Sequence, residues 1–156
     1  MSGPLSGYKV LDMSRVLAGP AATVLLADQG ADVIKVEPLR GDVVRAMGGG
    51  GLTSGYLTSN RGKRSIALDL KSESGIAVVK RLAENVDVFV QNFRPGAIDG
   101  MGLGESVIRE INPKIIYVSM SGFGEKGPYA HKRVYDPVIQ ALSGLADLQA
   151  TDSQDR

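Results

Sequence analysis

Basic side chains recur where the expected strands end, at positions where an anionic ligand could meet them. Four of these cations each follow a different strand: Arg15, Arg40, Lys71 and Arg94. Others precede the third strand or the last apolar segment: Arg61, Lys63, Arg64, Lys132 and Arg133. A ligand with several phosphates needs converging cations, because each phosphate oxygen must replace its lost hydration. The pattern predicts an anion site, although any single member could equally be a solvated surface charge.

Other kinds of chemistry lack the residues that they need. The chain has no cysteine, which excludes disulfides, thiolate metal sites and a cysteine nucleophile. His131, the only histidine, has no companions at metal-ligand spacing, so we expect a surface residue and no metal site. Ser121 lacks the flanking glycine of a nucleophile elbow. Glu37 ends a second strand, as the ribose-binding acid of a dinucleotide fold does, but the first turn, 18–23, lacks the three-glycine fingerprint.

Strand-like and helix-like segments alternate along the chain. Strands are expected at 8–13, 32–37, 65–70, 87–91 and 114–120. Helices are expected at 20–30, 72–86, 105–111 and 134–148. A long loop is expected at 39–64, which includes the glycine run 48–51. The alternation predicts an α/β fold: a Rossmann-like open, mostly parallel sheet with helices on both faces.

In such a sheet, ligands bind beyond the carboxyl ends of the strands. Those ends are expected at 13–18, 37–40, 69–71, 91–94 and 119–123. The basic residues that follow the strands therefore fall on the side of the sheet where a ligand is expected.

The composition is that of a folded domain without a strong overall field. The chain has 156 residues, 43% of them apolar and 22% charged, with a net charge of +1. That charge does not favour nucleic acid or a membrane surface as a partner. The longest apolar run, 16–27, is broken by Gly19 and Pro20 and is too short to span a bilayer. No export signal is visible, and we expect a cytosolic (cytoplasmic) protein.

Several blocks of sequence also carry a family resemblance over nearly the whole chain. They are 4–7, 10–12, 18–20, 26–37 (LADQGADVIKVE), 60–71 (NRGKRSIALDLK), 87–96, 101–104, 112–117 and 122–128. Together these blocks resemble the class III coenzyme A-transferases, a family that includes formyl-CoA transferase and the α-methylacyl-CoA racemases. The resemblance implies that residues 1–156 form the N-terminal part of a coenzyme A-binding large domain, with the small domain and the C-terminal part outside this chain.

The resemblance also implies where coenzyme A would lie. Leu17 and Ala18 would pack along the pantetheine arm near the thioester, and Arg40 would approach the phosphates. Two strand ends would frame the adenosine part: Leu68, Asp69, Leu70, Lys71, Asn92, Phe93 and Arg94. Lys132, Arg133 and Tyr135 would close the site from the last segment. Alternatives stay open for some members, since Leu68 or Leu70 could be core and the Phe93 ring could pack inward.

The implied activity is transfer of coenzyme A from an acyl-CoA to a carboxylic acid through enzyme-bound aspartyl intermediates. The catalytic aspartate is expected beyond Arg156, so Asp136, Asp147, Asp152 and Asp155 are not assigned that role. No cofactor other than coenzyme A or acyl-CoA is implied, and the full-length protein is expected to form an interlocked homodimer.

Two other functions remain open. A racemase would carry a catalytic histidine where this chain has Tyr135, and tyrosine there favours transfer. If the chain were complete, a non-catalytic coenzyme A-binding module would be the better account. Leu17 stands where formyl-CoA transferase has glutamine and Gly100 where it has arginine, which argues against formate and oxalate as substrates. The apolar Leu17 instead favours a larger or more apolar acyl group.

Overall fold

The computed structural model of the protein describes residues 3–47 and 52–149. The chain divides into two units, Met1–Met120 and Ser121–Arg156, each described by itself. In the first unit, a five-stranded sheet is formed by β1 (Lys9–Asp12), β2 (Asp32–Glu37), β3 (Arg64–Ala67), β4 (Val88–Gln91) and β5 (Ile116–Ser119). The connections contain α1 (Ala18–Asp28), the 3-10 helix η1 (Val43–Arg45), α2 (Ser54–Asn60), α3 (Glu73–Ala83), α4 (Ala97–Gly100) and α5 (Glu105–Ile111).

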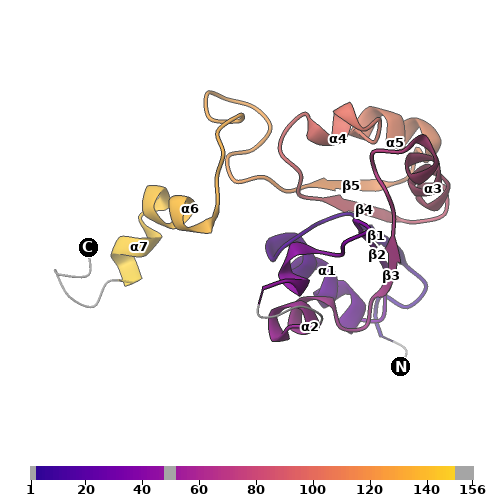
Figure 1. The fold of residues 1–156 in the computed structure, drawn as a ribbon, viewed down its shortest axis with the longest axis horizontal. Coiled ribbons are helices and arrows are strands. Elements are labelled where there is room, and N and C mark those ends of the chain that lie inside the picture. The colour runs from indigo at the N-terminus through magenta and orange to yellow at the C-terminus, as the bar shows by residue number, and fades with distance from the viewer. Residues whose placement is uncertain (1–2, 48–51, 150–156) are drawn as a thin grey trace. The chain divides into compact units, whose positions relative to one another are not determined.

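All neighbouring strands run parallel, in the order β3-β2-β1-β4-β5 (Figure 1). The chain builds outward from β1 through β2 to β3, then returns to place β4 on the free side of β1. The direction of winding therefore reverses between β1 and β4. Ligands of open parallel sheets bind beyond the carboxyl ends of the strands at such a reversal.

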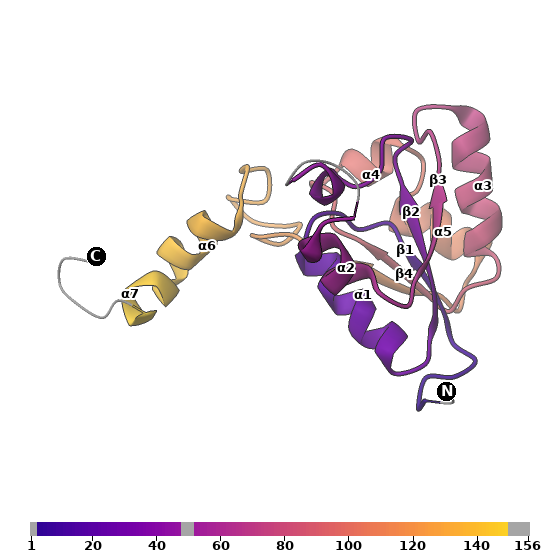
Figure 2. The same ribbon diagram turned by 60° about the horizontal axis from the view of Figure 1, so that its bottom comes forward.

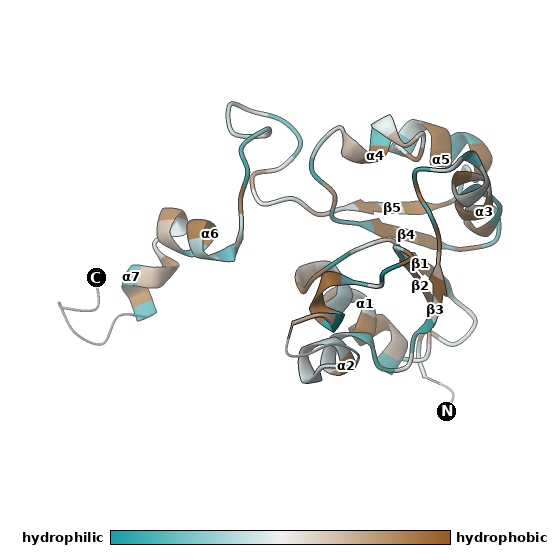
Figure 3. Ribbon diagram, viewed as in Figure 1, coloured by the Kyte–Doolittle hydropathy of each residue, from teal (hydrophilic) through white to brown (hydrophobic). Residues whose placement is uncertain are grey.

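Helices cover both faces of the sheet, with α1 and α2 on one side and α3 and α5 on the other (Figure 2). Alternate residues of a strand point to opposite faces. On one face, Val10 and Val90 pack in a small cluster against α1. On the other, Leu11 and Phe89 belong to the larger core, which also holds Val79 of α3. Both faces are buried, and apolar residues fill the middle of the central strands, which are brown there in Figure 3, while charged residues stand at or near the strand ends.

The predicted fold class is confirmed, and most of the predicted elements are found close to their expected bounds. All the strands exist, and the helices expected at 20–30, 72–86 and 105–111 correspond to α1, α3 and α5. In α3 the apolar residues recur on one helical face, a local pattern that predicts a helix. α1 is apolar on most sides, so its bounds were indicated mainly by Pro20 near its start and Gly30 after its end.

The predicted strand 65–70 is too long, because β3 ends at Ala67. A turn begins at Asp69, whose Oδ1 accepts a hydrogen bond from the Lys71 amide at 3.0 Å. The Ser72 hydroxyl then caps α3 by accepting a hydrogen bond from the Gly75 amide at 3.1 Å. These local side-chain bonds offer the backbone an alternative to the strand ladder.

The loop predicted at 39–64 is also wrong in part, because it contains η1 and α2. Each helix starts at a capping side chain: the Asp42 carboxylate accepts a hydrogen bond from the Val44 amide at 3.1 Å, and the Thr53 hydroxyl accepts one from the Tyr56 amide at 3.2 Å. Such short helices show little periodicity, so the two caps were their main sequence signals. The glycine run 48–51 lies outside the described residues.

In the second unit, the single helix predicted at 134–148 is two helices, α6 (Asp136–Ser143) and α7 (Leu145–Gln149). Gly144 separates them with a φ of 79°, a left-handed conformation that ends a helix. Earlier in this unit, the rings of Phe123 and Tyr129 meet edge to face with centroids 5.5 Å apart.

Phe89 provides a test of this core. Its ring is fully buried and stacks on Tyr117, with centroids 5.1 Å apart. Phe89→Ala is expected to lower the free energy of unfolding by about 3–5 kcal/mol, because it leaves a cavity beneath α3 and α5. Leu25→Ala on the exposed side of α1 is the control and should change it by less than about 0.5 kcal/mol. Equal effects of the two variants in urea denaturation would contradict the packing described here.

Candidate functional site

The connection from β1 to α1 lies at the reversal point, and side chains distant in sequence hold its backbone. The Ser14 amide donates to Asp12 Oδ1 at 2.9 Å, and the Ser14 carbonyl accepts from Lys35 Nζ at 3.0 Å. The Arg15 amide donates to Asn92 Oδ1 and the Arg15 carbonyl accepts from Asn92 Nδ2, both at 2.8 Å. Four consecutive backbone groups of this connection are therefore satisfied by side chains.

The next backbone group belongs to Val16, whose amide points at the Asp42 carboxylate, with N–O distances of 3.2 and 3.4 Å. Val16 has a φ of 68°, and it is the only residue other than glycine among those described with a positive φ. A β-branched residue in the left-handed region costs roughly 1–2 kcal/mol and persists only where its surroundings enforce it. Leu17 and Ala18 follow directly and are exposed.

Two buried lysines lie under this connection. Lys35 Nζ pairs with Asp42 Oδ2 at 3.1 Å, and both side chains are 1% exposed. Lys63 Nζ pairs with Asp12 Oδ2 at 3.0 Å and donates to Thr23 Oγ1 at 2.8 Å. Burial lowers the pKa of the Lys63 amine, while Asp12 opposes that shift. An unpaired charge in this position would be costly, so each lysine requires its aspartate.

Three of the cations proposed for ligand binding are therefore engaged within the protein. Lys63 is interior, with its side chain 1% exposed. Arg61 pairs with Asp28, and Arg64 pairs with Asp32 across the start of β2 and β3. Lys63 belongs to the interior, so its interpretation as a ligand-side charge is wrong, whereas Arg61 and Arg64 form exposed ion pairs of small energetic weight.

Arg15 is the cation nearest the reversal point. Its guanidinium carbon lies 4.8 Å from the centre of the Phe93 ring, a cation–π distance. Burial lowers the pKa of the Arg15 guanidinium, and the nearby Asp42 charge opposes the shift. Within the described part of the chain, Arg15 Nε is the one buried side-chain nitrogen or oxygen without a hydrogen-bond partner. The cation–π contact with Phe93 therefore helps to balance the burial of this guanidinium.

Glu37 at the end of β2 is fully occupied by protein donors. It accepts from Arg45 Nε at 2.7 Å, Tyr56 Oη at 2.6 Å, Ser65 Oγ at 2.8 Å and the Asp42 amide at 2.9 Å. Burial by itself raises the pKa of Glu37, but these hydrogen bonds together outweigh burial and hold the pKa well below its ordinary value. The carboxylate anchors η1 and α2 to the sheet, which agrees with rejecting it as a ribose ligand.

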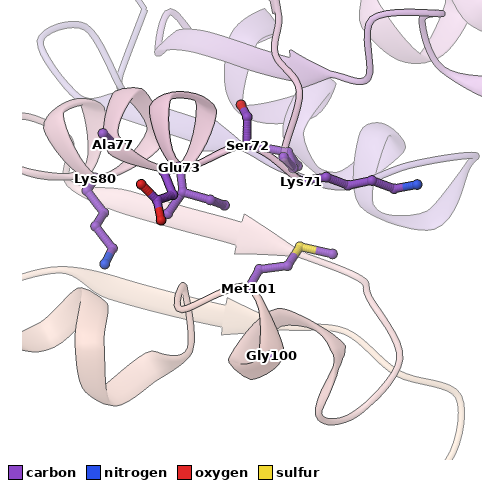
Figure 4. Close-up of a pocket in the computed structure, with 9 residues that line it drawn as sticks. Lys71, Ser72, Glu73, Ala77, Lys80, Gly100 and Met101 are labelled. Carbon is purple, nitrogen blue, oxygen red and sulfur yellow. The ribbon is translucent and has the colours of Figure 1, made fainter.

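A cavity of about 570 Å³ opens where β3 leads into α3. It is lined by Leu70, Lys71, Ser72, Glu73, Ile76, Ala77, Lys80, Gly100 and Met101. Figure 4 shows the Glu73 and Lys80 side chains extending from α3 on the side that faces Met101. A side chain at Gly100 would meet no atom within 4 Å, so the glycine leaves this end open. The volume is within the usual range of small-molecule sites.

The structure places the predicted binding residues in three groups. Exposed residues at the carboxyl edge are Leu17, Ala18, Arg40, Asp69, Lys71 and Arg94. Half-buried ones are Leu68, Leu70, Asn92 and Phe93. Leu68, Leu70 and Phe93 pack against the larger core, and the Asn92 amide hydrogen-bonds to the Arg15 backbone. Lys132, Arg133 and Tyr135 are exposed residues of the second unit, and their part in a site stays a prediction.

The buried pair of Lys35 and Asp42 was not predicted from the sequence. A lysine inside the β2 run of apolar residues was the available signal, because a strand buried on both faces rarely keeps a charge without a partner. The partner could not be identified from sequence, since several acidic residues lie close to it along the chain.

Comparison with known proteins decides the family. Residues 5–156 match the family described as CoA-transferase family III. The chain belongs to CoA-transferase family III. Within the described residues, no group of three histidine, cysteine or acidic side chains could hold a metal ion, and no helix is long and apolar enough to cross a membrane.

Relatives in CoA-transferase family III extend well beyond this chain. Human succinyl-CoA:glutarate CoA-transferase is 47% identical over 156 residues, covering 97% of this chain and 36% of the relative. Formyl-CoA:oxalate CoA-transferase of Streptomyces coelicolor is 47% identical over 143 residues, covering 90% of this chain and 35% of the relative. A crystal structure of a CAIB/BAIF family protein from Brucella suis superposes with a TM-score of 0.91 at 42% identity, covering all of this chain and 43% of that one. This chain spans little more than a third of the length of the two curated relatives.

The Glu37 anchor predicts a pH dependence of stability. Because the folded-state pKa lies below the ordinary value of 4.5, the carboxylate stabilises the fold above that value and this stabilisation is lost as the pH falls through and below it. Glu37→Gln should lower the free energy of unfolding by about 2–3 kcal/mol at pH 7. The difference between wild type and variant should shrink below about pH 4.5.

Urea denaturation from pH 7 to pH 3 measures this difference. Glu84→Gln, an exposed residue at the end of α3, is the matched control and should change stability by less than about 0.5 kcal/mol at pH 7. A wild-type advantage over Glu37→Gln that grows on acidification would contradict the assignment.

Proposed function

We propose that this protein transfers coenzyme A from an acyl-CoA to a carboxylic acid, and that its first unit holds the coenzyme A. The observation that carries the proposal is membership of CoA-transferase family III along nearly the whole chain. The fold supports it, since the reversal point between β1 and β4 is where an open parallel sheet offers a ligand site.

The exposed cations of the carboxyl edge suit the three phosphates of coenzyme A. Arg40 follows β2, Lys71 follows β3 and lines the cavity, and Arg94 follows β4. No ion pair is found for these three among the described residues, in contrast to Arg61 and Arg64. We assign Arg40 to the phosphates and the β3 and β4 ends to the adenosine 3′-phosphate part. Leu17 and Ala18 then meet the pantetheine arm near the thioester.

Arg94 is the most direct test of this assignment. Arg94→Ala in the whole gene product should weaken coenzyme A binding about tenfold, because one charge-assisted contact to phosphate is lost. Arg81→Ala, another exposed arginine, is the matched control on α3 and should leave the dissociation constant within about twofold. Titration calorimetry at fixed ionic strength measures both. Absence of coenzyme A binding by the wild type would overturn the proposed function itself.

The proposed chemistry is covalent catalysis by an aspartate carboxylate. Its oxygen attacks the thioester carbon, the carbon–sulfur bond breaks, and coenzyme A leaves as the thiolate. The thiolate then attacks the aspartyl carbonyl of the resulting anhydride, which releases the donor acid and leaves an aspartyl thioester. The acceptor carboxylate repeats the sequence in reverse. The covalent intermediates divide one difficult transfer into several easier steps. We place this aspartate outside residues 1–156, as the family resemblance implies.

The acceptor is proposed to be a dicarboxylic acid of about the size of glutarate. Relatives are named for glutarate, oxalate or L-malate, all of which carry two carboxylates. Leu17 favours the longer members, because its side chain is 61% exposed beside the proposed thioester position and offers apolar surface to methylene groups.

A single-turnover experiment tests the intermediate and the acceptor together. Incubation of the whole gene product with succinyl-CoA alone should add coenzyme A to the protein as a thioester, seen by intact mass. Glutarate should then remove the bound coenzyme A from the protein faster than oxalate does, forming glutaryl-CoA. Preferred discharge by oxalate would contradict the role given to Leu17. Deuterium exchange at the α-carbon without transfer would instead indicate a racemase.

A further inference from the structure

We infer that Asp42 is a positioning residue, which together with Lys35 fixes the backbone at Val16–Ala18 in the shape that receives the thioester end of an acyl-CoA. The inference rests on the proposed function, because that function places Leu17 and Ala18 along the pantetheine arm. Asp42 itself touches no ligand in this arrangement and acts through the backbone.

The Asp42–Lys35 pair forms hydrogen bonds with the β1–α1 connection at two points. Lys35 Nζ donates to the Ser14 carbonyl at 3.0 Å, and the Asp42 carboxylate accepts from the Val16 amide at 3.2 Å. The two contacts bracket Arg15, which Asn92 holds from β4. Since Asp42 and Lys35 are themselves joined at 3.1 Å and buried, they form one rigid support beneath the loop.

The hydrogen bond to Asp42 is the contact that compensates for the strain at Val16 and keeps its φ positive. The hydrogen bonds from Asp12 and Asn92 act on the residues before it, and no other side-chain bond to the Val16 amide is found among the described residues. Without the Asp42 carboxylate, no side chain holds the Val16 amide in its inward orientation, and Val16 relaxes toward a negative φ. Such a rotation redirects Leu17 and Ala18, which come next in the chain.

The nucleotide end of the ligand provides an internal reference. The cavity between α3 and α4 is lined by none of the residues from Asp12 to Asp42. Arg40, which is assigned to the phosphates, is exposed and has no ion pair with Asp42 among the described residues. A change at Asp42 should therefore affect ligands that carry the pantetheine arm, while a ligand that contains only the nucleotide should bind as before. General damage to the fold would weaken both ligands.

Asp42→Asn in the whole gene product isolates the effect. Asparagine is as good a helix cap as aspartate, so the start of η1 is retained, whereas the charge that pairs with Lys35 and attracts the Val16 amide is lost. Coenzyme A binding should weaken about tenfold. Binding of adenosine 3′,5′-bisphosphate, the nucleotide end alone, should change by less than about twofold. Hydrogen exchange of the Val16 amide should accelerate.

A second variant tests the cause. Glycine adopts the left-handed region without steric cost, so adding Val16→Gly to Asp42→Asn should recover most of the lost coenzyme A affinity. Asp32→Asn, which breaks the exposed pair with Arg64, is the matched control and should leave both ligands unaffected. The inference is overturned if Asp42→Asn weakens both ligands equally, weakens neither, or is not rescued by glycine. If the wild type binds neither ligand, the proposed function fails. The exchange rate of the Val16 amide then still shows whether Asp42 holds the backbone at Val16.

Discussion

Two lysines with almost no exposed surface, Lys35 and Lys63, must be neutralised inside the first unit, and the carboxyl edge of the sheet is organised around that requirement. An isolated ammonium in such a place would be very costly, so each pairs with a buried aspartate and with neutral acceptors. Their partners, Asp42 and Asp12, accept hydrogen bonds from the backbone of the same connection. The two aspartates that neutralise the buried lysines therefore also hold the backbone of the loop after β1.

This arrangement divides the basic residues into two sets. Lys35, Lys63 and Arg45 have buried acidic partners and stabilise the fold. Arg40, Lys71 and Arg94 stand exposed at the ends of three different strands and belong to the side where a parallel sheet meets its ligand. A polyanion such as coenzyme A can thus be met by the exposed set, while the buried set keeps the loops at the reversal point in place.

Asn92 connects the two loops that diverge at the reversal. Its amide bonds both backbone groups of Arg15, and the neighbouring Phe93 ring lies under the Arg15 guanidinium. The resemblance implies that Asn92 and Phe93 frame the adenosine part, with an inward-packing Phe93 ring as the alternative. In the structure the Asn92 side chain joins β4 to the loop after β1, and the Phe93 ring packs against the larger core. The Asn92 side chain therefore holds together the two loops that follow β1 and β4.

The sequence alone determined the family, the strands and the longer helices. Apolar periodicity is local, so runs such as 32–37 and 105–111 specify their own secondary structure. The position of the site at the carboxyl edge also follows from a parallel sheet. The tertiary structure decided which charges are buried, that Val16 is held in a left-handed conformation, and that Asn92 bonds to backbone. Those properties depend on partners far apart in sequence, since 51 residues separate Lys63 from Asp12 and 77 separate Asn92 from Arg15. Burial and pairing arise only when the chain brings such residues together; a local pattern can indicate that Lys35 is buried, but it does not identify the partner.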